Sequence, residues 1–181
     1  MKRWILCICF IFLFSAEINS QGKDFGIGVF LGAGNISGNL PSQTSFVAGV
    51  TIDFLPSFTQ GLPLRLGAVY ARKFEVLLPS GLQGKYYPYV KGIFLKGVLQ
   101  QPLGKVGYLE EALGPLLLND RTFNDVDVYD IGAVFSLLVG FNFTDAVSGG
   151  FKVGVGVEYG STFTNTTAQY TSVHLLGQYF F

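Results

Sequence analysis

The chain has 181 residues, of which 49% are hydrophobic and only 13% are charged. Its length indicates one domain, and its 12 basic and 12 acidic residues leave no excess of positive charge for binding nucleic acid. Both cysteines, Cys7 and Cys9, lie in an apolar run near the N-terminus, so the rest of the chain offers neither disulfides nor cysteine metal ligands.

The N-terminus has the pattern of a secretory signal peptide. Residues 1–3 are a short basic region, residues 4–14 are an unbroken apolar run, and residues 15–20 are mostly small or polar. A run of this length is too short for a transmembrane helix, although an uncleaved anchor is the alternative. We predict Sec-dependent export, cleavage after Ser20, and a single domain over residues 21–181.

Eight later segments alternate apolar residues with small or polar ones, which is the two-residue period of a β-strand. They cover residues 25–34, 46–54, 64–73, 87–99, 107–118, 129–143, 151–160 and 171–181. After residue 20 no apolar run reaches the roughly 18 residues of a transmembrane helix, whereas strands of about ten residues cross a membrane at a tilt. We therefore predict an all-β fold, an eight-stranded antiparallel up-and-down transmembrane β-barrel.

The connections and the aromatic residues suggest how the barrel is oriented. Residues 35–44, 77–85, 119–127 and 161–168 form long polar connections, and residues 55–63, 100–105 and 144–149 form shorter ones. This alternation is typical of outer-membrane barrels, with long loops outside and short turns in the periplasm. Aromatic girdles are then expected at the periplasmic ends (Phe25, Phe54, Phe143, Phe151, Tyr179, Phe181) and at the outer ends (Tyr70, Tyr129, Tyr159).

Charged residues of both signs fall on the faces that this alternation turns inward. They are Arg65, Lys73, Lys96, Glu110, Asp130, Lys152, Glu158 and His174. An eight-stranded barrel is just wide enough for side chains to fill, and buried charges need partners. We expect a paired polar network that plugs the interior; the alternative is an ion path.

His174 is the only histidine, and Ser172 lies on the same strand face two residues earlier. With Glu158 or Asp130 these residues could make a catalytic triad, but a triad depends on geometry that the sequence does not give. No second metal ligand follows at a useful spacing, and the loop acids Asp120, Asp125 and Asp127 lack the EF-hand pattern. We expect no enzyme activity, no metal and no cofactor.

Residues 108–115 carry a family resemblance. The stretch Tyr108-Leu109-Glu110-Glu111-Ala112-Leu113-Gly114-Pro115 resembles the Tyr-x-Glu-Ala-Gly-x-Gly-Pro stretch of the small, porin-like "outer membrane protein beta-barrel domain" family. Tyr108, Glu110, Gly114 and Pro115 match, whereas Glu111 and Ala112 depart from it. The signal region, the hairpin rhythm and the apolar last strand ending at Phe181 extend the resemblance along the chain, but they are shared with other small barrels such as the OmpA membrane domain and OmpX.

The resemblance implies an eight-stranded barrel in the outer membrane of a Gram-negative bacterium, inserted by the barrel-assembly machinery, which in such families reads the C-terminal signature that includes Phe181. It implies mostly no assigned activity. We therefore expect a structural or surface-interaction role, with the ligand carried by the extracellular loops. The alternatives are a narrow porin-like conduit for ions or small molecules, a lipid-modifying enzyme, and a secreted lipocalin-like barrel.

Two charged residues conflict with a simple lipid-facing surface. By alternation Lys91 and Glu111 point outward, where charge is costly away from the interface. Lys91 is tolerable near an interface. For Glu111, either a β-bulge shifts the strand register or a partner covers that side.

Overall fold

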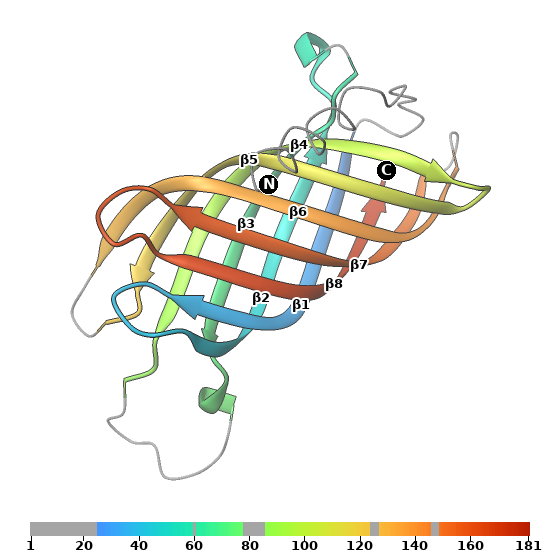
Figure 1. Ribbon diagram of the computed structural model, residues 1–181. Coiled ribbons are helices and arrows are strands. Elements are labelled where there is room, and N and C mark those ends of the chain that lie inside the picture. The colour runs from blue at the N-terminus through green and yellow to red at the C-terminus, as the bar shows by residue number, and fades with distance from the viewer. Residues whose placement is uncertain (1–24, 60, 78–85, 124–126, 146–148) are drawn as a thin grey trace, which may run out of the picture.

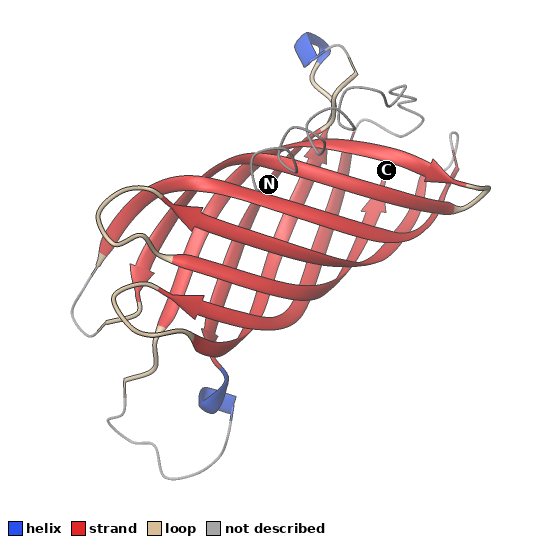
Figure 2. Cartoon of the chain, viewed as in Figure 1, coloured by secondary structure: helices blue, strands red, loops and turns tan. Residues whose placement is uncertain are grey.

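The computed structural model describes residues 25–59, 61–77, 86–123, 127–145 and 149–181 as one closed β-barrel (Figures 1 and 2). The predicted signal peptide, residues 1–20, lies outside the described residues. The strands are β1 (Phe25–Ser37), β2 (Gln43–Phe54), β3 (Leu64–Lys73), β4 (Tyr89–Leu103), β5 (Gly107–Arg121), β6 (Val128–Asp145), β7 (Gly149–Thr162) and β8 (Gln169–Phe180). They pair antiparallel in chain order and β8 closes onto β1, so the predicted eight-stranded up-and-down barrel is confirmed.

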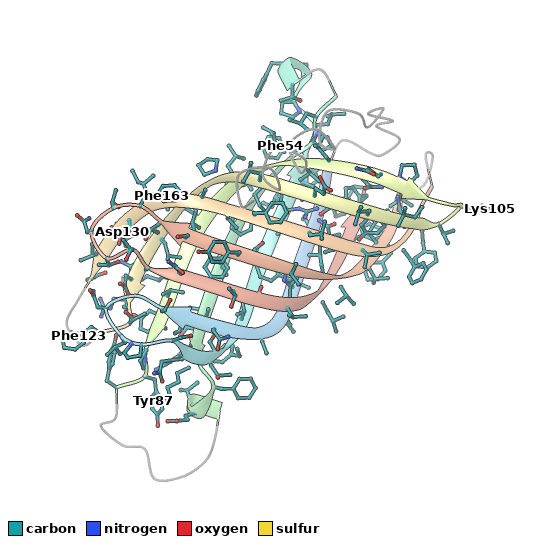
Figure 3. The ribbon with its side chains drawn as sticks, in the orientation of Figure 1. Phe54, Tyr87, Lys105, Phe123, Asp130 and Phe163 are labelled. Atoms are coloured by element: carbon teal, nitrogen blue, oxygen red, sulfur yellow. The ribbon has the colours of Figure 1, made fainter. Side chains whose placement is uncertain are left out.

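The barrel has two distinct ends. The loop end carries the β1–β2, β3–β4, β5–β6 and β7–β8 connections, and the turn end carries the other three connections, the start of β1 and the end of β8. Figure 3 labels Phe123, Asp130 and Phe163 at the loop end and Phe54 and Lys105 toward the turn end. Two short 3-10 helices, η1 (Ser57–Thr59) and η2 (Phe74–Leu77), lie in the connections.

None of the helices in the described part of the chain is long and apolar enough to cross a membrane.

Several strands extend beyond their predicted ends. β4 continues to Leu103 and β5 to Arg121, because their ladder runs from Tyr89 opposite Arg121 to Leu103 opposite Gly107. Continued pairing satisfies backbone groups that a longer loop would leave to solvent. The predicted connection 100–105 therefore shrinks to a tight turn in which Gly104 has a φ of 75°, a conformation that favours glycine.

The two faces of the sheet differ as the alternation predicts. Outward Leu31, Ile131 and Leu175 are 63–66% exposed, whereas inward Val90 and Val134 are fully buried. A water-soluble barrel would bury its apolar face instead, so the large exposed apolar surface is the arrangement of a barrel whose outside meets lipid.

The interior is not polar throughout, as a simple plug would be. Toward the loop end it is filled by apolar side chains, among them Ile36, Val47, Val90 and Leu118, all at most 1% exposed. Further down, the Phe30 ring lies against Gly49, where an added Cβ would overlap the ring. A glycine at this wall position therefore makes room for a large side chain inside a narrow barrel.

The strand register around Glu111 contains no bulge. β5 keeps one register with β4 and one with β6 along its printed pairs, and Glu111 stands opposite Leu99 and Leu137. The alternative that a bulge turns Glu111 inward is therefore wrong. Glu111 lies on the outward face and is half-buried.

Candidate functional site

Arg65 lies at the centre of the interior charges. It stands directly opposite Asp53 in the β2–β3 ladder, and its guanidinium binds that carboxylate through two hydrogen bonds of 2.7 Å. A second carboxylate, Glu110 of β5, accepts a hydrogen bond of 2.5 Å from Arg65 Nη1. All three side chains are at most 6% exposed, so this is a fully buried, two-sided ion pair of the kind that the planar guanidinium favours.

The same contacts continue to the far wall of the barrel. Lys152 of β7 donates to Glu110 Oε2 over 3.1 Å and to Gln100 Oε1 of β4 over 2.7 Å. Gln178 of β8 donates to Asp53 Oδ2 over 3.0 Å. We call this group the turn-end network; its members are Asp53, Arg65, Gln100, Glu110, Lys152 and Gln178. It joins six strands and crosses the lumen, so each of its charges has an opposite charge beside it.

A second group lies nearer the middle of the barrel. Lys96 Nζ donates to Glu158 Oε2 over 2.6 Å and to Ser136 Oγ over 3.1 Å, and the Tyr170 hydroxyl donates to Glu158 Oε1 over 2.7 Å. The Lys96 ammonium also lies 4.3 Å from the centre of the Phe94 ring. We call Lys96, Ser136, Glu158 and Tyr170 the middle cluster. It too balances one cation with one carboxylate.

His174 does not complete a triad. Its Nδ1 lies 3.1 Å from Ser172 Oγ, and its ring packs 5.1 Å from the Phe30 ring. Within the described residues no hydrogen bond links it to a carboxylate, and Glu158 uses its two oxygens on Lys96 and Tyr170. Because a catalytic set needs nucleophile, base and orienting carboxylate together, this geometry supplies only the first two.

Two predicted members of the interior network lie apart from it, at the loop end. Asp130 is buried, but its carboxylate accepts hydrogen bonds from Thr164, Asn165 and Thr166 of the β7–β8 loop, including both the backbone and the hydroxyl of Thr166. Lys73 ends β3 and pairs over 3.1 Å with the half-exposed Glu75. Asp130 therefore holds the β7–β8 loop, and Lys73 lies at the edge of the loop end, outside both interior groups.

Two members of the turn-end network, Asp53 and Gln100, were not predicted from the sequence. Asp53 could have been predicted, because it has inward parity and lies one residue before the end of β2, opposite Arg65. Gln100 carries no comparable signal, since only closure of the barrel shows that it reaches Lys152.

The predicted girdle aromatics lie on the outward face at both ends. At the turn end Phe25, Phe143, Phe151, Tyr179 and Phe181 are 44–58% exposed, and Phe54 is half-buried opposite Phe25. At the loop end Tyr129 and Tyr159 are exposed, whereas Tyr70 packs between the Phe46 and Tyr89 rings, 6.0 and 5.7 Å away. Tyr87, two residues before the start of β4 at the same end, is buried.

The described acids of the loop after β5, Asp120 and Asp127, do not belong to a group of three metal-ligating side chains. Asp125 lies outside the described residues. Asp127 accepts a hydrogen bond from Asn119 Nδ2 over 2.6 Å and pairs with Arg121 over 2.8 Å, and these contacts hold its pKa below the usual range. Among the described residues no group of three or more metal-ligating side chains comes together.

No family model and no curated protein matches the chain. Solved structures do match its fold. The crystal structure of Neisserial surface protein A (NspA) has 13% sequence identity and a TM-score of 0.62, covering 87% of this chain and 97% of NspA. Ail, the attachment invasion locus protein of Yersinia pestis, has 9% identity and a TM-score of 0.53, with 88% and 99% covered.

The N-terminal β-barrel domain of Pseudomonas aeruginosa OprF adds a third match, with 10% identity, a TM-score of 0.52, and 88% and 98% of the two chains covered. All three are small eight-stranded outer-membrane barrels. Identities this low show a common fold and nothing finer. The chain therefore has the fold of the small outer-membrane barrels, the OmpA/OmpX-like architecture that its sequence predicts.

Proposed function

We propose that the protein is an integral barrel of the bacterial outer membrane, exported by the Sec pathway, with a structural or surface-interaction role carried by its loop end. The observation that carries the proposal is the inverted distribution of side chains: apolar residues cover the outside, and ion pairs fill part of the inside. Lipid can cover the exposed apolar surface without any protein partner, whereas contact of that surface with water is unfavourable in free energy.

The paired interior supports a plug rather than a conduit. A conduit needs wetted charges that can exchange partners with a passing ion. Here the two cations Arg65 and Lys152 and the two carboxylates Asp53 and Glu110 already neutralise one another across the lumen, and all four are at most 6% exposed. Apolar side chains at the loop end lie above them. A permeating ion would have to break several buried contacts, which is costly.

The loop end supports a role in surface interaction. Phe123 and Phe163 are 51% and 71% exposed there and lie at the same end in Figure 3. The loop that carries Phe163 is held in shape by Asp130, so its aromatic side chain is presented from an ordered backbone. Ail, one of the proteins with the same fold, is an attachment protein by its name. We propose that this protein is not an enzyme, because Ser172 and His174 lack the orienting carboxylate.

The experiment is fractionation of cells that express the full chain. We expect the protein to remain in the outer-membrane fraction after a carbonate wash, and to run faster on a gel unheated than boiled, because closed barrels resist detergent until they are heated. A protein released by the wash would contradict the membrane assignment. An equal mobility before and after boiling would contradict a stable barrel.

Conductance in a planar bilayer tests the plug separately. We expect the purified protein to insert without discrete current steps. Stepwise currents in the wild type would favour the conduit. Arg65→Met breaks the plug, so current steps that appear only in this variant would support the plug.

A further inference from the structure

Three cations stand together on the outward face of the barrel at the loop end: Arg72 of β3, Lys91 of β4 and Arg121 of β5. Arg72 is opposite Tyr89, and Tyr89 is opposite Arg121, so these three side chains form one row across the strands. Lys91 stands in the next row, between Tyr70 and Asn119. We call Arg72, Lys91 and Arg121 the basic rim.

Tyrosine rings hold the two arginines of the basic rim in place. The Arg72 guanidinium carbon lies 5.8 Å from the centre of the Tyr89 ring and 5.9 Å from that of Tyr87. Arg121 lies 5.9 Å from the same Tyr89 ring. A guanidinium beside an aromatic ring keeps hydrogen-bond donors at its edge, so the rings position these two cations; of the two, Arg121 also pairs with Asp127.

In the described part of the chain the basic rim has more cations than paired anions. Within the described residues its one ion pair is Arg121 with Asp127. The Nε atoms of Arg72 and Arg121 are buried and have no hydrogen-bond acceptor, and the exposed Lys91 has no ion pair in the same part of the chain. The buried Nε atoms are out of reach of a ligand, so an oxygen ligand would accept hydrogen bonds from the Nη groups of these two half-buried side chains.

An open apolar hollow of about 840 Å³ lies beside Lys91 of the basic rim, on its turn-end side, and extends across the strands from β1 to β6. Lys91, Tyr70 and Asn119 form its loop-end border, and Val50, Ile93 and Leu117 line its length. Ala68 lies in the same row as these three, and its short side chain leaves the space between larger neighbours. Its size is in the range of ligand clefts, about 300–1,000 Å³.

We propose that this face binds one acylated lipid whose headgroup carries phosphate, with a phosphate on the basic rim and an acyl chain in the hollow. Arginine binds phosphate oxygens through paired N–H donors, which the Nη groups of Arg72 and Arg121 can supply. A charged rim above an apolar hollow matches a molecule that is anionic at one end and apolar at the other. The proposal rests on the membrane position proposed above.

The opposite side of the barrel shows that this is a local feature. The outward residues at the loop end of β1, β7 and β8 include Asn35, Tyr159 and Thr171, and no lysine or arginine lies among the described residues there. A general attraction to an anionic membrane surface would place cations all round the rim. The restriction of cations to β3–β5, over the hollow, favours one bound lipid at one place.

Native mass spectrometry of the purified full chain in neutral detergent tests the site. The probes are diphosphoryl lipid A, the same lipid with its phosphates removed, and inorganic pyrophosphate. We expect the wild-type protein to prefer the phosphorylated lipid by at least about tenfold. The triple substitution Arg72→Gln, Lys91→Gln and Arg121→Gln should remove that preference, and Ala68→Leu, which fills the hollow, should weaken binding of both lipids.

Matched controls are Lys105→Gln, which removes an exposed cation from the turn end, and Ala133→Leu on the outward face of β6, whose ladder partners Pro115 and Ser161 do not line the hollow. Both should bind lipid as the wild type does. If the triple variant lacks the heat-dependent gel shift, the single substitution Lys91→Gln, at an exposed position, replaces it in the test. Its preference for the phosphorylated lipid should fall about threefold.

The proposal is overturned if the folded triple variant keeps the wild-type preference, or if pyrophosphate binds as tightly as the lipid. The first outcome would remove the basic rim from binding, and the second would make the site one for a soluble phosphate. Neither outcome affects the membrane assignment, which depends on fractionation. Conversely, a protein absent from the outer membrane would contradict the proposed function even if it bound lipid in detergent.

Discussion

The turn-end network and the basic rim are two sets of charges in one barrel, and their surroundings among the described residues differ: the charges of the first are paired, and most of those of the second are not. Inside, Arg65 contacts two carboxylates and an amide, and it is 2% exposed. On the outer wall, Arg72 contacts rings and one hydroxyl, and its Nε has no acceptor. The comparison separates charges that hold the barrel together from charges that remain available to a ligand.

Arg65→Met should have the largest effect. The substitution leaves Asp53 without a cation in the described part of the chain and removes one of the two cations that contact Glu110. Breaking a buried ion pair from one side costs about 3–5 kcal/mol. We expect a loss of this size in the free energy of unfolding, measured by guanidinium titration of the barrel in detergent. The control Lys105→Gln should change it by less than about 0.5 kcal/mol. A loss below about 1 kcal/mol for Arg65→Met, the size of an exposed ion pair, would end the distinction between the two regions.

Glu158→Gln should cost less, about 2–3 kcal/mol, because Lys96 keeps Ser136 and the Phe94 ring as partners. The same unfolding measurement on the double variant Lys96→Met, Glu158→Gln supplies the check. Removing both charges avoids an unpaired ammonium, so the double variant should be more stable than the sum of the two single losses predicts by about 1–3 kcal/mol. Additive losses would mean that the two side chains do not depend on each other.

Asp130→Ala should act locally. It removes the acceptor of four hydrogen bonds from the β7–β8 loop but leaves the ladders of β6 intact. We expect a loss of about 1–2 kcal/mol in global stability and faster proteolysis within residues 163–168. Unchanged proteolysis there would show that the loop does not need the carboxylate.

Alternation in the sequence was enough to predict the barrel, because a two-residue period places each strand's faces without knowledge of the neighbours. It also placed Arg65, Glu110 and Lys152 inside. It could not predict their pairing, since the partners come from β3, β5 and β7, and the stagger of the closed barrel decides which strands meet across the lumen. Asp130 shows the same limit: its inward parity was correct, but its partners come from a loop without a period.

The basic rim was harder to predict, for a related reason. From the sequence, Lys91 was identified only as a charge on a face that should be lipid-facing, and Arg121 lay in a predicted loop. The ladder shows that β5 continues to Arg121, which aligns it with Tyr89 and Arg72. Three cations on separate strands become one surface only when the register of those strands is known, and sequence patterns leave that register open.

The basic rim should matter little for stability, which is the converse of the Arg65 prediction. The triple substitution of Arg72, Lys91 and Arg121 by glutamine should change the free energy of unfolding in lipid-free detergent by less than about 1 kcal/mol, because exposed or partly exposed charges contribute little. The guanidinium titration used above measures this directly. A loss near that of Arg65→Met would make the rim structural, and any loss of lipid binding would then have a different cause.

Asp127→Asn should give the smallest effect, and one of opposite sign. Asp127 carries the acid that partly neutralises Arg121, so its removal should strengthen retention of diphosphoryl lipid A by about two- to threefold at low salt, the scale of an exposed ion pair. The hydrogen bond from Asn119, together with Arg121, keeps the pKa of Asp127 below its usual range, so the carboxylate stays charged unless the pH falls through that lowered value. The difference between variant and wild type should therefore persist from about pH 5 down to about pH 4, where a free aspartate with a pKa of about 3.9 is already half protonated; native mass spectrometry at each pH measures it. A difference that halves by about pH 4 would mean that Asp127 titrates like a free carboxyl and does not hold Arg121.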